Sequence, residues 1–119
     1  MEHIAAMVIG AGQAGLATSH ELTARGVEHV VLETGRVAET WRTRRWRSFR
    51  LVNPNWLNRV PGFWYDGDDP DGFFSASEYI DYLERYAASF AAPVRGETTV
   101  TSLVPGERGF VVKTTRGDL

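Results

Sequence analysis

Three glycines near the start of the chain, Gly10, Gly12 and Gly15, have the spacing G-x-G-x-x-G. In that pattern the first glycine permits a tight turn, the second lets the backbone approach a phosphate, and the third lets a helix pack closely on the preceding strand. A helix that begins there directs free N–H groups and the positive end of its dipole at phosphate oxygens. The candidate site for a dinucleotide pyrophosphate therefore comprises Gly10, Ala11, Gly12, Gln13, Ala14 and Gly15.

A carboxylate at the expected distance supports the same chemistry. Glu33 follows the glycine turn by about twenty residues, where an acid accepts hydrogen bonds from ribose hydroxyls. An acid at this position would repel a 2′-phosphate, which argues against NADP in this site. The spacing does not separate FAD from NAD, and a glycine turn of purely structural use is the alternative to both.

The elements that must position these residues can be read from the hydrophobic pattern. Residues 4–9 are apolar without alternation, which is typical of a strand buried on both faces of a parallel sheet. Residues 14–25 contain good helix formers and end at Gly26, and residues 29–33 form a second β-branched strand. This βαβ unit predicts an α/β fold with a Rossmann-like, doubly wound parallel sheet, as one domain over residues 1–119.

The remaining chain divides into three parts. Residues 36–72 are an irregular segment within this domain, rich in tryptophan and arginine, and such a long segment is usually functional when it is ordered. Ser75 and the glutamate three residues later fit a capping box, which predicts a helix with one face on the sheet. Residues 98–104 and 110–115 read as strands joined by a turn, forming a small β-meander, and we expect 98–104 to be the third strand beside the first two.

The end of the sequence carries a further expectation. Residues 117–119 bring another turn signal and no closing element. In the doubly wound order both flanking strands would lie on one side of the first strand and leave its other edge bare. Because a bare apolar edge promotes aggregation, we expect either a truncated chain, the N-terminal portion of a longer enzyme, or a chain that self-associates through this sheet edge.

Composition excludes several other functions. The 119 residues carry a formal net charge of −2 and are 43% hydrophobic, so we expect a globular domain that binds no nucleic acid. No cysteine is present, and the three histidines lack metal-ligand spacing, so we expect no disulfide and no metal site. No apolar run is long enough for a signal peptide or a membrane span, and we expect a soluble, cytoplasmic protein with no membrane partner.

Several motifs in order along the chain resemble a known family. They are residues 10–16 (GAGQAGL), 31–33 (VLE), 40–42 (TWR), 51–54 (LVNP), Leu57, 61–63 (PGF) and the segment 79–86. This succession is similar to the N-terminal part of the flavin-containing monooxygenases and their bacterial relatives, which are FAD-dependent pyridine nucleotide oxidoreductases. The resemblance covers essentially the whole chain.

The resemblance implies a cofactor and further site residues. FAD would bind at the glycine turn and Glu33. The region of Trp41 and Arg42 and the loop of Asn53 would fold over the flavin side. Val100 on the third strand would offer its backbone to the adenine. NADPH would reduce the flavin in the full-length protein, whose NADPH-binding domain is absent here. One oxygen would then pass, through a flavin hydroperoxide, to a small-molecule substrate.

No residue of the chain is a convincing acid, base or nucleophile, so the catalytic residues are unknown and the isolated chain is expected to be inactive. Alternatives stay open: an NAD-binding dehydrogenase domain, a reductase with its cysteine pair elsewhere, a non-catalytic dinucleotide-binding module, or a truncated remnant. Two side-chain groups have two interpretations each. The tryptophans either line the flavin site or pack in the core; they are Trp41, Trp46, Trp56 and Trp64. The arginines either bind cofactor phosphates or form a solvent-exposed face; they are Arg42, Arg44, Arg45, Arg47 and Arg50.

Overall fold

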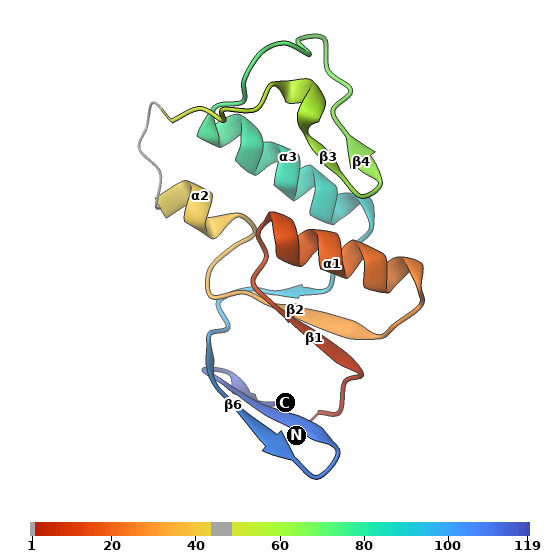
Figure 1. Ribbon diagram of the computed structural model, residues 1–119. Coiled ribbons are helices and arrows are strands. Elements are labelled where there is room, and N and C mark those ends of the chain that lie inside the picture. The colour runs from red at the N-terminus through yellow and green to blue at the C-terminus, as the bar shows by residue number, and fades with distance from the viewer. Residues whose placement is uncertain (1, 44–48) are drawn as a thin grey trace.

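The computed structural model describes residues 2–43 and 49–119, and its centre is a three-stranded parallel sheet (Figure 1). The sheet has the strand order β1 (Ala6–Ile9), β2 (His29–Leu32) and β5 (Val94–Arg95). Val8 pairs with Val31, and Val31 pairs with Val94. Helix α1 (Gln13–Ala24) connects β1 to β2, which confirms the predicted βαβ unit and the α/β, Rossmann-like fold.

The third strand of the sheet differs from the prediction. It is β5, which lies before the predicted 98–104, and the N–H of Val31 donates to the Pro93 carbonyl oxygen at 3.0 Å. The predicted strand instead opens an antiparallel sheet, in the order β6 (Val100–Gly106), β7 (Gly109–Thr114) and β8 (Gly117–Asp118). A two-residue strand is too short to show a period of two in the sequence, which explains why β5 was missed.

Two different layers cover the two faces of the parallel sheet, because successive side chains of a strand point to opposite faces. On one face Val8 and Val31 share a core with α1 and with α3 (Ala76–Ser89), whose Leu83 is fully buried. On the other face Val30 and Leu32 pack with residues of the antiparallel sheet. Figure 1 shows the helices above the parallel sheet and this predicted β-meander below it.

Helix α3 begins at the predicted capping box. The Ser75 hydroxyl accepts from the Glu78 N–H at 3.2 Å, and the Glu78 carboxylate accepts from the Ser75 N–H at 2.9 Å. Three tyrosines one helical turn apart, Tyr79, Tyr82 and Tyr86, form its buried face. This face joins the core that the parallel sheet lines, as the sequence predicted.

The irregular segment 36–72 contains short elements in its described part. They are α2 (Glu39–Thr43), a 3₁₀ turn η1 (Asn55–Leu57) and the hairpin of β3 (Arg59–Val60) and β4 (Phe63–Trp64). The buried Tyr82 hydroxyl donates to the carbonyl oxygens of Asn58 and Phe63, and the Asn55 amide donates to the Asp69 carbonyl oxygen at 2.9 Å. Bonds between side chains and backbone therefore order the part of this segment from Asn55 to Asp69, and such bonds leave no periodic signal in the sequence.

Strand β1 is an edge strand of the described sheet. The strand covers only the second part of the predicted range 4–9. Val8 is buried, but Ala5 and Ile9 are exposed, Ile9 by 58%, so the prediction of a strand buried on both faces is wrong at both ends of this range. Strand β2 pairs with β1 on one side and no described strand pairs with it on the other, which is the bare edge expected from the topology. A groove of about 960 Å³ lies between residues 2–7 and the β6–β7 turn.

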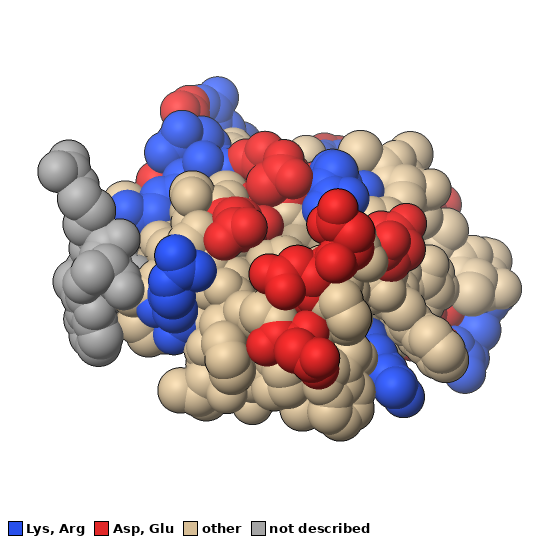
Figure 2. Space-filling model, turned by 90° about the horizontal axis from the view of Figure 1, so that it is seen from above, with Lys and Arg blue, Asp and Glu red and all other residues tan. Residues whose placement is uncertain are grey.

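The face seen from above in Figure 2 carries acidic side chains grouped near its middle, with basic side chains mostly around them. Exposed ion pairs join the two signs within the chain, such as Arg85 with Asp81 at 2.9 Å and Arg50 with Glu78 at 3.9 Å. Such pairs contribute little to stability individually. Among the described helices none is both long and apolar enough to cross a membrane.

Candidate dinucleotide-binding site

The turn from β1 into α1 needs glycine at two positions for its own geometry. Gly10 has φ +104°, a backbone conformation that disfavours residues with a Cβ, and its N–H donates to the Leu32 carbonyl oxygen at 2.8 Å. A Cβ built on Gly15 would collide with the carbonyl oxygen of Gly10. These two glycines therefore form the tight turn and let α1 pack against it, whether or not a ligand is bound.

Gly12 differs from the other two glycines. Its φ of −90° and ψ of −164° are open to any residue, and a Cβ built there has no other atom within 4 Å. Neither backbone strain nor packing explains a glycine at this position. A side chain here would, however, fill the open space at the N-terminus of α1.

That helix terminus has free donors. Gly12 is the N-cap and has no side chain to accept from the first turn of α1, which also contains no acidic residue. The Leu16 N–H donates to the Gly12 carbonyl oxygen at 2.9 Å, and the helical N–H groups before it lack intrahelical acceptors. These N–H groups and the helix dipole favour an anionic group in the open space beside Gly12.

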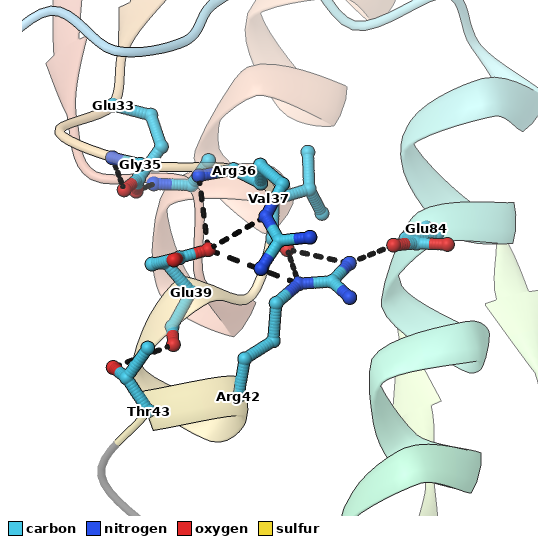
Figure 3. A network of polar contacts seen from close by, with 9 residues as sticks. Glu33, Gly35, Arg36, Val37, Glu39, Arg42, Thr43 and Glu84 are labelled. Atoms are coloured by element: carbon cyan, nitrogen blue, oxygen red, sulfur yellow. Dashed lines mark hydrogen bonds and ion pairs between the residues drawn. The ribbon is translucent and has the colours of Figure 1, made fainter.

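Glu33 lies directly after β2 and bonds to the glycine turn. One carboxylate oxygen accepts from the Ala11 N–H at 2.8 Å. The other accepts from the Gly35 N–H at 2.7 Å (Figure 3). These two bonds fix the position of the carboxylate. Each oxygen keeps further acceptor capacity, so the group can still accept hydrogen bonds from ribose hydroxyls. The structure thus brings together Glu33 and the glycine turn, two sites 22 residues apart in sequence.

The predicted residues Trp41 and Arg42 lie on α2, and both contact α3. The Trp41 ring packs edge-on against the Tyr79 ring, with centroids 4.6 Å apart. Arg42 pairs with Glu84, and its guanidinium also donates to the Val37 carbonyl oxygen at 3.4 Å (Figure 3). Arg42 therefore links α2 to α3, and its expected contact with the flavin stays a prediction.

The remaining two predicted residues lie apart from the turn in sequence. Asn53 is exposed in the loop before η1. Val100 opens β6 and pairs with Thr114, so its position on the third parallel strand was wrong. Val100 lies two residues after Thr98. The Thr98 N–H donates to the Glu33 carbonyl oxygen at 2.8 Å, and this bond joins the segment just before β6 to the end of β2.

Two side-chain contacts were not predicted from the sequence. The Tyr79 hydroxyl donates to the Gln13 side-chain oxygen at 2.8 Å, across 66 residues of sequence. Ser19 and His29 are both buried, and the Ser19 hydroxyl lies 2.7 Å from Nε2 of His29. No local motif announces either pair, because each depends on how α1 packs in the folded chain.

Among the other predicted tryptophans and arginines, those in the described part of the chain lie at the surface. Trp56 and Trp64 are 45% and 65% exposed, so their interpretation as core residues was wrong. The Arg59 guanidinium lies over both rings, 5.9 Å and 5.1 Å from their centroids. Arg50 donates to the Phe73 carbonyl oxygen at 2.9 Å. The residues outside the described part of the chain are Arg44, Arg45, Trp46 and Arg47.

The chain as a whole matches a known protein family. A match to the family described as "Pyridine nucleotide-disulphide oxidoreductase" covers residues 7–119. The chain belongs to this family. Its members include FAD-dependent oxidoreductases and monooxygenases, which confirms the resemblance stated from the motifs.

Individual relatives agree with this family assignment. An "Uncharacterized oxidoreductase CzcO-like" of Geobacillus kaustophilus is 37% identical over 99% of this chain and 34% of its own length. The structure of a flavin-containing monooxygenase from Stenotrophomonas maltophilia matches with a TM-score of 0.86 and 25% identity over 98% of this chain and 35% of its own. The structure of a steroid monooxygenase bound to NADP matches with a TM-score of 0.79 and 28% identity. This match covers 94% of this chain and 23% of the steroid monooxygenase chain. The chain spans about a third of the length of the first curated relatives.

Proposed function

We propose that this chain binds FAD, as the dinucleotide-binding part of an NAD(P)H-dependent flavoprotein oxidoreductase of the monooxygenase type. The observation that carries the proposal is Gly12, whose absent side chain leaves open space although the fold does not require a glycine there. A pyrophosphate that binds close to the backbone would explain a glycine at this position, because any side chain would occupy its place.

The groups around Gly12 have the hydrogen-bonding chemistry that binding of FAD requires. The free N–H groups at the start of α1 would bind the pyrophosphate, and the Glu33 carboxylate, held by Ala11 and Gly35, would accept from the ribose. A 2′-phosphate would meet this carboxylate, which supports FAD over NADP at this turn. NADPH is expected to bind the full-length protein elsewhere, because the relatives extend well beyond the length of this chain.

The bound flavin would supply the redox chemistry, accepting a hydride from NAD(P)H and passing electrons to oxygen for insertion into a small-molecule substrate. The described residues of this chain bind and orient the cofactor: the turn holds the phosphates and Glu33 holds the ribose. Two similar structures, the steroid monooxygenase bound to NADP and the flavin-containing monooxygenase, support this type of reaction.

The test is an absorption spectrum of the purified chain, before and after incubation with FAD and desalting. Flavin bands that stay with the protein are expected, and Gly12→Ser should abolish them by placing a Cβ in the phosphate position. Serine is also a good N-cap, so this variant should unfold at the same temperature as the native chain. Retained flavin in Gly12→Ser, or NAD binding without FAD binding by the native chain, would contradict the proposal.

A further inference from the structure

The side chain of Gln13, at the start of α1, has a fixed partner. Gln13 is exposed, yet its Oε1 accepts from the hydroxyl of Tyr79, a residue that is only 3% exposed, at 2.8 Å. Gln13 directly follows Gly12 and is the first residue of α1, so this bond restrains a polar side chain at the start of that helix. The partner comes from the first turns of another helix, α3.

The Tyr79 hydroxyl is the donor in this hydrogen bond, and Oε1 of Gln13 is the acceptor. Burial raises the pKa of Tyr79 to about 12, with a smaller contribution from Tyr82, so the hydroxyl keeps its proton at neutral pH. Because the phenol donates to Oε1, the amide nitrogen of Gln13 keeps both of its N–H groups. No acceptor for that nitrogen occurs among the side-chain contacts of the described residues, so two neutral donors remain at the edge of the turn.

The position of the Tyr79 ring is set by other aromatic side chains. Trp41 packs edge-on against it at 4.6 Å between centroids, and Tyr82 stacks on it at 6.0 Å. Phe74 lies at 6.3 Å from the same ring. Since close packing leaves such a ring few alternative positions, the hydroxyl is a fixed point to which Gln13 is attached.

We infer that Tyr79 is a positioning residue for the dinucleotide site: it holds Gln13 so that the Gln13 amide donates to the pyrophosphate beside the N–H groups of α1. This inference rests on the proposed function. It adds a side-chain donor to the pyrophosphate part of the site, where the other donors are backbone N–H groups. The aromatic side chains around Tyr79 would then also affect ligand affinity, because they hold the Tyr79 ring in position.

The test compares the dissociation constants of FAD, ADP and adenosine for the native chain and four variants. Tyr79→Phe removes the hydroxyl and keeps the ring, Gln13→Met removes the amide, and a third variant combines both changes. Each should bind FAD and ADP roughly ten- to a hundredfold more weakly, as expected for loss of a hydrogen bond to a charged group. Adenosine, which has no pyrophosphate, should bind unchanged. The double variant should be no weaker than either single one, because both changes remove the same contact.

Tyr82→Phe, the fourth variant, is the matched control. It also removes a buried hydroxyl from α3, but its bonds go to the carbonyl oxygens of Asn58 and Phe63 in the hairpin region. It should lower the unfolding temperature and leave the FAD affinity unchanged. If Tyr79→Phe fails to fold, the exposed Gln13→Met variant still tests the donor.

The outcomes separate the inference from the function on which it rests. Unchanged FAD and ADP affinity in Gln13→Met, with normal binding by the native chain, would overturn the inference and leave the proposed function intact. An equal loss of adenosine binding would also overturn it, since the pair would then act on the fold rather than on the pyrophosphate. A native chain that binds neither FAD nor ADP would overturn both.

Discussion

The Glu33 carboxylate accepts a hydrogen bond from the backbone N–H of Ala11, at 2.8 Å, inside the glycine turn. Ala11 is fully buried, so its N–H would otherwise lack a partner. The second carboxylate oxygen accepts from Gly35 at 2.7 Å. The acid that is expected to bind a ribose therefore also stabilises the turn that is expected to bind the pyrophosphate.

Replacing Glu33 should consequently affect both stability and cofactor binding. In Glu33→Ala the Ala11 and Gly35 N–H groups lose their acceptor, and we expect the free energy of unfolding to fall by about 1–3 kcal/mol. FAD affinity should fall as well. Urea denaturation measures the first effect and FAD titration the second. Glu28→Ala, an exposed change before β2, is the control, and an unchanged unfolding midpoint in Glu33→Ala would show that the two bonds contribute nothing.

How far the sequence predicted the fold and the site can be judged from particular residues. The β1–α1–β2 unit, the Ser75 capping box and the meander were predictable because each depends on local spacing. The role of β5 was not, because two residues carry no period. The contact of Glu33 with the turn was expected from motif spacing, whereas the Tyr79 contact with Gln13 depends on packing between helices distant in sequence.

The buried Ser19–His29 pair should contribute to stability without contributing to binding. Nδ1 of His29 lies 2.9 Å from the Val27 carbonyl oxygen and Nε2 lies 2.7 Å from the Ser19 hydroxyl, so the ring joins α1 to the start of β2. Ser19→Ala leaves a buried ring nitrogen without a partner and should cost about 1–3 kcal/mol in urea denaturation. Thr18→Ala, on the exposed side of the same helix, should cost less. Equal losses in the two variants would contradict this account.

The capping box of α3 should make stability depend on pH. Hydrogen bonds from the Ser75 backbone and side chain lower the pKa of Glu78 below its ordinary value of 4.5, and the charge of Arg50 adds to the effect. A carboxylate with a lowered pKa in the folded state stabilises the fold above the unfolded-state pKa, and this contribution disappears as the pH falls through the folded-state pKa.

The matching variant is Glu78→Gln, which keeps a side-chain acceptor and removes the charge. The native chain should be more stable than this variant at pH 7, and the difference in unfolding temperature should shrink as the pH falls below 4.5. Asp81→Asn, on the exposed side of α3, is the control for general charge effects. A difference that stays constant from pH 7 to pH 3 would contradict the assignment.

The open edge of β1 should mediate self-association of this chain. Its outer backbone groups are unpaired by any described strand, and Ile9 is 58% exposed at its end. Leu103 and Phe110, on the meander beside the groove, are 53% and 66% exposed. An unpaired strand edge with apolar neighbours favours pairing with a second copy. Sedimentation velocity should therefore show a larger species as concentration rises.

Ile9→Lys places a charge at this edge and should shift the chain toward the monomer, because a lysine on an edge strand opposes pairing with another strand. Val52→Lys is the control, since Val52 is 88% exposed on the loop before η1, away from β1 in sequence. Equal association of the native chain and Ile9→Lys would place the contact elsewhere. A decrease caused by Val52→Lys instead would assign the contact to the loop before η1.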